Sequence, residues 1–171
     1  MSLSSGTAED GNTGEVRIET GASQSGSTGT LILNTGFADS GTSGSISIVV
    51  GSGDVGAGGR LVLSAGQVRR PGQTGGVLQL SSGQGLSSSS GHVQISTPDA
   101  TFTDDTGRIS LFTGVAGSGS SGSISLSTGA ATCGDAGSVI LEIGAASSGA
   151  AGTVSMLSGS TDSGVGGDVV I

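Results

Sequence analysis

Apolar and polar residues alternate in short stretches that recur along the whole chain. Two positions in each stretch are always apolar, which gives two columns of twelve residues. The first column is Met1, Val16, Leu31, Ile46, Leu61, Leu78, Val93, Ile109, Ile124, Val139, Val154 and Val169, and the second is Leu3, Ile18, Leu33, Ile48, Leu63, Leu80, Ile95, Leu111, Leu126, Leu141, Met156 and Ile171. Alternation with a period of two predicts extended strands, each with one buried face.

Glycines separate these stretches at a fixed spacing. The 15-residue unit is Gly-x-φ-x-φ-x-(Thr/Ser)-Gly-x-x-x-x-Gly-x-x, where φ is apolar, and its period is constant apart from one step of 17 and one of 16. A single strand cannot bury its apolar face alone. If successive repeats stack about 4.8 Å apart, equivalent residues lie above one another and cover this face. The sequence therefore predicts an all-β fold, a single-domain β-solenoid over 1–171 with about eleven coils and uncapped ends. The glycines are expected at positive φ or where backbones approach closely.

The repeat is irregular between residues 66 and 106. Two residues are inserted around Val68–Pro71, the third glycine is missing from 83–90, Pro98 replaces a second glycine, and 101–105 carries one extra residue. Insertions in repeat proteins often map to a binding face. Exposed loops also tolerate insertions without any function.

Composition and charge exclude several classes of protein. The chain has 36 glycines but no glycine at every third residue, which excludes collagen. The net charge is −8 and there is no lysine, which argues against a nucleic-acid partner. No apolar run approaches the roughly 20 residues of a membrane span. We expect neither a cofactor nor a metal, since the recurring Gly-Gly-x-Gly-x-Asp motif of calcium-binding repeats is absent.

One outward column offers candidate binding chemistry. It contains Arg60, Val77, His92 and Arg108, in which His92 and Arg108 are expected one turn apart. Such a basic strip could bind an anion or a carboxylate-bearing glycan. The alternative is a set of solvated charges. Catalysis has little support, because His92 and Cys133 are single residues expected three turns apart, and we predict that the protein is not an enzyme.

Two features favour assembly. Outward apolar residues, including Ile32, Val62, Ile140 and Phe112, predict a face for lateral contact with another chain. The sequence also starts and stops in mid-strand, which favours either end-to-end association or continuation of a longer repeat array. Ice binding is an alternative, but the column with most threonines, which contains Thr20, Thr35, Thr97, Thr113 and Thr128, is expected to face inward and is interrupted by Val50, Ala65 and Ile143.

The repeats Gly122–Gly129 and Gly44–Gly51 resemble the Gly/Ser-rich tandem repeats of large secreted or cell-surface proteins of microbial eukaryotes such as algae. The resemblance covers the whole chain and implies an extracellular, structural or adhesive role, without assigning any site residue. We therefore expect a structural building block of a long extracellular filament or surface rod, formed by coil-on-coil stacking. An ice-binding protein and a glycan-binding adhesin segment are the alternatives.

Overall fold

The computed structural model describes residues 2–101 and 104–171. Met1, which belongs to the first apolar column, and Phe102 and Thr103, which belong to the irregular zone, lie outside the described residues. The chain divides into two units, Met1–Ser81 and Ser82–Ile171. Their boundary falls inside the irregular zone at 66–106. The single repeat domain over 1–171 stays a prediction.

The predicted β-solenoid is wrong, because the described residues form no helix and no strand. A strand in a sheet exists only where its backbone N–H and C=O groups pair with a neighbouring segment. Alternating apolar residues favour an extended backbone, but they do not by themselves supply that neighbour. The prediction failed because these segments do not pair with one another in the described residues.

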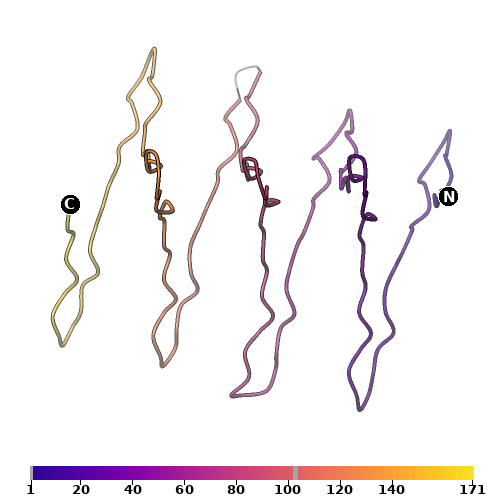
Figure 1. Ribbon diagram of the computed structural model, residues 1–171, viewed down its shortest axis with the longest axis horizontal. Helices are drawn as coiled ribbons and strands as arrows, with labels where there is room; N and C mark the ends of the chain where they lie inside the picture. The colour runs from indigo at the N-terminus through magenta and orange to yellow at the C-terminus, as the bar shows by residue number, and fades with distance from the viewer. Residues whose placement is uncertain (1, 102–103) are drawn as a thin grey trace. The chain divides into compact units, whose positions relative to one another are not determined.

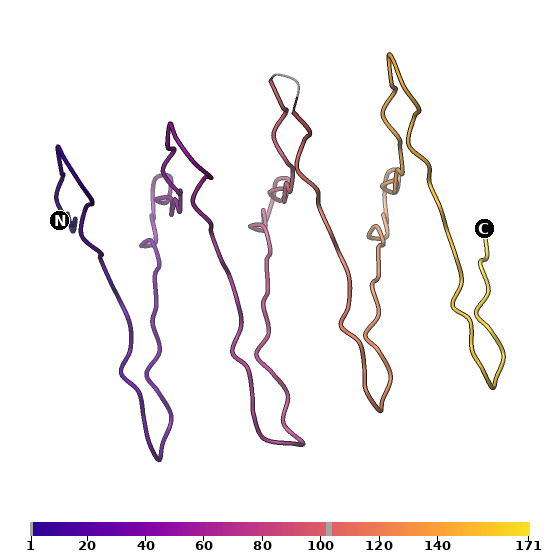
Figure 2. The same ribbon diagram turned by 180° about the vertical axis from the view of Figure 1, so that it is seen from behind.

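The 15-residue period nevertheless survives in the local geometry of both units. In the first unit, sharp bends lie at 9–11, 24–26, 39–41, 54–57 and 70–72. In the second they lie at 86–88, 104, 117–119, 132–134, 147–149 and 162–164. Figure 1 and Figure 2 show that the chain in each unit runs in extended stretches between these turns. Each repeat is therefore an extended segment followed by a turn loop.

The extended segments and turn loops take their bounds from the glycines. The segments are 15–20, 30–35, 45–50, 60–65, 77–82, 92–97, 108–113, 123–128, 138–143 and 153–158, with 168–171 beginning another. The loops between them run from the second glycine of one repeat to the leading glycine of the next. The eleven leading glycines are Gly14, Gly29, Gly44, Gly59, Gly76, Gly91, Gly107, Gly122, Gly137, Gly152 and Gly167.

Each turn loop closes at a neck, where its two ends meet. A Cβ built on any of the eleven leading glycines lies 2.6–3.6 Å from a side-chain atom of the residue that ends the preceding segment. These neck residues form the third column, which is Ser5, Thr20, Thr35, Val50, Ala65, Ser82, Thr97, Thr113, Thr128, Ile143 and Ser158. Examples are Gly59 against Val50 Cγ1 at 2.6 Å and Gly29 against Thr20 Cβ at 3.5 Å. The backbone N–H of Gly167 also donates a hydrogen bond to the Gly159 carbonyl at 3.0 Å. A Cβ therefore clashes at the tightest neck, Gly59, and makes ordinary or tight van der Waals contact at the other necks.

The tip of the turn loop explains another glycine column. The third glycine of the repeat lies at this tip, and in five repeats it is in the left-handed region: Gly11, Gly56, Gly72, Gly134 and Gly149, with φ from 76° to 116°. That region costs an L-residue with a Cβ roughly 1–2 kcal/mol. The prediction that glycines serve positive φ or close approach is confirmed at these loop tips and at the necks.

No described residue is buried. The chain exposes 17,104 Å², whereas a compact protein of 16.0 kDa exposes about 7,400 Å². The apolar columns are therefore arranged along the segments but not covered by other parts of the chain.

Candidate functional site

The repeated apolar face of the extended segments is the main candidate site. Its two columns are exposed, and most apolar residues of the loops are exposed further. Val16 of the first column is 47% exposed and Ile18 of the second is 59% exposed, whereas Val115 in a loop is 100% exposed. An exposed apolar face that recurs along the chain is typical of a surface that contacts a partner.

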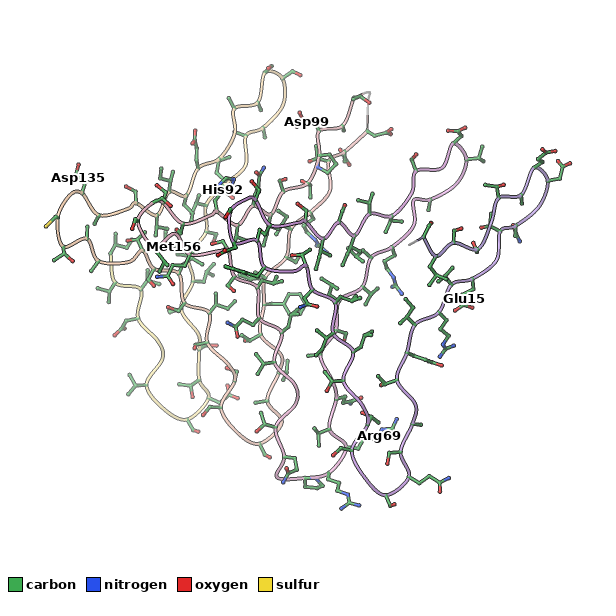
Figure 3. All side chains as sticks on the ribbon, turned by 45° about the vertical axis from the view of Figure 1, so that its right-hand side comes forward. Glu15, Arg69, His92, Asp99, Asp135 and Met156 are labelled. Atoms are coloured by element: carbon green, nitrogen blue, oxygen red, sulfur yellow. The ribbon has the colours of Figure 1, made fainter. Side chains whose placement is uncertain are left out.

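Charged residues lie outside this apolar face. Within the segments they occupy the positions between the apolar columns, as Glu15, Arg17 and Glu19 do. Of the 13 acidic residues in the sequence, nine lie in the turn loops, and they are Glu9, Asp10, Asp39, Asp54, Asp99, Asp104, Asp105, Asp135 and Asp162. Figure 3 shows Asp135 at the outer edge of its loop. Most acidic residues therefore lie in the turn loops, outside the two apolar columns.

One ion pair is present among the described residues. Arg17 Nη2 lies 2.5 Å from Glu19 Oε2, and both side chains are more than half exposed. The two residues are neighbours on the outward side of segment 15–20, so their side chains point the same way. An exposed pair of this kind contributes about 0–1 kcal/mol to stability.

The predicted basic strip is not assembled by contacts. Arg60 belongs to the first unit, whereas His92 and Arg108 belong to the second. Across the described ranges, no side-chain hydrogen bond or ion pair involves any of these three residues. All three are exposed. Their role as a binding site stays a prediction.

The predicted lateral face is exposed as well. Ile32 and Val62 lie in the first unit, and Phe112 and Ile140 lie in the second. Their exposed fractions of 60–81% exceed the 46–59% of the described first-column residues and overlap those of the second column. Their role in assembly stays a prediction.

The third inward column has a role that sequence reasoning missed. Its small or β-branched residues pack on the next leading glycine, as Thr113 and Ile143 do on Gly122 and Gly152. The Thr113 hydroxyl also donates a hydrogen bond to the Gly122 carbonyl at 3.3 Å. The near-constant sequence separation between the two columns was the signal that could have revealed this contact. The threonines considered as an ice-binding rank are therefore neck residues.

Residues 2–101 and 104–171 contain no pocket and no group of three potential metal-ligating side chains. Cys133 is an exposed free thiol. No helix among these residues is long and apolar enough to cross a membrane.

The chain matches no known protein-family model, no curated protein and no solved structure. The resemblance to Gly/Ser-rich repeats of secreted proteins stays a prediction.

Proposed function

We propose that the protein is a structural building block of a long extracellular filament or surface rod. One observation carries this proposal: the same exposed apolar face and the same closed loop recur with a 15-residue period in both units. A surface repeated at a fixed period offers one contact many times over. Assembly through such a surface gains stability with every repeat added.

The proposal does not include stacking of coils within one chain. The described residues form no sheet that could hold such coils together. The assembly must therefore use contacts that one chain does not make by itself. The extracellular location rests on the resemblance of the repeats to those of secreted proteins.

Sedimentation velocity and negative-stain microscopy of the full chain over a range of concentrations test the function. We expect large assemblies and elongated particles. A monomer at every concentration contradicts the proposal, and ice shaping with thermal hysteresis points instead to the ice-binding alternative. Immunolabelling of intact cells of the source organism tests the location, and signal seen only after permeabilisation contradicts it.

A further inference from the structure

The extended segments lack the partner that their backbone and side chains require. Three backbone–backbone hydrogen bonds are found in the described part of the chain, and all three join glycines at loop necks. The segments themselves have no such bond to another segment. Their N–H and C=O groups are free to pair with a strand from outside the chain.

The second glycine column also indicates an approach from outside. Glycine occupies this position in ten of eleven repeats, at Gly6, Gly21, Gly36, Gly51, Gly66, Gly83, Gly114, Gly129, Gly144 and Gly159, with Pro98 as the exception. A Cβ built on any of these ten meets nothing within 4 Å, and only Gly6 has a left-handed φ. Nothing within the chain therefore requires glycine at the other nine positions. Glycine is typical of positions where another backbone comes close.

The missing cover is large. The chain exposes about 9,700 Å² more than a compact protein of its mass, taking 17,104 Å² less about 7,400 Å². A standard protein–protein interface buries about 1,600 Å² in total. A small partner bound at one place therefore leaves most of this surface exposed. The partner must follow the chain along many repeats and present an apolar face of the same period.

We propose that the partner of each extended segment is an equivalent segment of another copy of this chain, aligned in parallel with equal repeat positions side by side. This inference rests on the proposed function and deepens it by naming the contact. A second copy matches the period, because it carries the same 15-residue unit. The second copy also places its own apolar columns beside those of the first. Its backbone pairs with the free N–H and C=O groups, with the two segments about 4.8 Å apart.

The spacing of the repeats sets the direction of pairing. Parallel pairing places the large aliphatic columns on themselves and the small third column on itself. Antiparallel pairing that brings Ser123 opposite Ser127 places Ile124 opposite Leu126. The 16- and 17-residue steps of the repeat break this match elsewhere in the chain, whereas parallel copies keep every column matched. In parallel pairing, each leading glycine lies beside the equivalent glycine of the other copy. The acidic turn loops of the two copies then also lie side by side. The resulting repulsion between loops is screened by solvent and salt.

Cysteine cross-linking of the full chain tests the alignment. In a Cys133→Ser background, single variants Ser123→Cys, Ser127→Cys and Ser138→Cys place thiols on the outward side of two segments. Ser123 and Ser138 occupy the same repeat position, whereas Ser127 lies four residues after Ser123. Parallel neighbours about 4.8 Å apart fall within the Cα–Cα range of a disulfide. A separation of four extended residues, roughly 13 Å, does not.

We expect rapid oxidation to join S123C with itself or S123C with S138C, at least tenfold faster than in denaturant. Mixed S123C–S127C dimers should not exceed the denatured control. Preferential S123C–S127C dimers indicate antiparallel pairing and overturn the inference. Filaments without any preferred cross-link also overturn it but leave the proposed function standing, whereas a monomer at all concentrations contradicts both.

A glycine substitution provides an independent readout. Gly129→Ala adds one methyl group in open space within the isolated chain, so an effect on assembly reports contact with another copy. We expect it to lower the extent of assembly at least several-fold. Ala130→Ser, at the adjacent position, is the matched control and should assemble normally. Full assembly of Gly129→Ala contradicts a close approach of copies at this column.

Discussion

The extended segments and the turn loops are built on different physical principles, although they alternate in one short repeat. The loops are closed by contacts within the chain: a leading glycine fits against a neck residue, and a tip glycine provides a positive φ. The segments have an equally regular pattern but no contact that uses it. The difference teaches that loop geometry is set locally, whereas strand pairing needs a second segment.

The two parts also tolerate variation differently. The loops carry the insertions of the 66–106 zone and most of the acidic residues, and their ends still meet at Gly76 and Gly91 through hydrogen bonds of 2.9 Å. The segments keep their apolar columns without exception. A surface that the chain leaves exposed is thus the one whose chemistry varies least along the repeats. This contrast supports a role of the segments in contacts between chains.

The largest expected effect comes from a charge in the apolar face of a segment. Ile124→Asp should abolish assembly, because an unpaired carboxylate in an apolar contact costs several kcal/mol. Sedimentation velocity measures the loss. Ser125→Asp adds the same charge on the outward side and should assemble like the wild type. Equal behaviour of the two variants contradicts a difference between the two faces.

A smaller effect is expected at a loop neck. Gly59→Ala places a Cβ 2.6 Å from Val50 Cγ1. Because the backbone or Val50 must shift to accommodate it, the stability of the assembled protein should fall by about 1–3 kcal/mol. Urea titration measures the change. The double variant Val50→Ala/Gly59→Ala removes the opposing methyl groups and should recover part of the loss. Additive losses in this double-mutant cycle contradict direct contact at the neck.

The tip of a loop should be less sensitive than that neck. Gly149 has φ of 104°, so Gly149→Ala should cost about 1–2 kcal/mol through backbone strain alone. The thermal midpoint of the assembled protein reports this cost. Ser148→Ala, at the adjacent position, should change the midpoint little. If the two variants have the same midpoint, Gly149 does not hold a left-handed conformation in solution.

The smallest effect is expected for the exposed ion pair of segment 15–20. Arg17→Ala should change stability by about 0–1 kcal/mol, and the change should shrink further at high salt. Urea titration at low and high salt measures it. A loss well above this range that persists in high salt indicates that Arg17 is covered by another chain.

Much of the local structure could be predicted from the sequence. The positions of the extended segments follow from the alternation around residues such as Val16 and Ile18. The positions of the bends and the need for glycine at Gly134 or Gly152 follow from the 15-residue spacing. These features depend on steric limits that act within a few residues. The contact between the third column and the leading glycines could also have been predicted, from the near-constant sequence separation of the two columns. The sequence analysis instead expected the third column to face an inner core.

The sequence by itself determined the period, the apolar face and the places where the chain bends, because alternation and glycine sterics act locally. Only the tertiary structure decided that the segments do not pair within the chain and that the leading glycines pack on neck residues. Pairing depends on which backbone lies at hydrogen-bonding distance, and an identical repeat matches a segment of its own chain and one of another copy equally well. The sequence pattern therefore determines which surface each segment presents, namely its apolar face. Only the structure shows that no other segment of the chain covers this face.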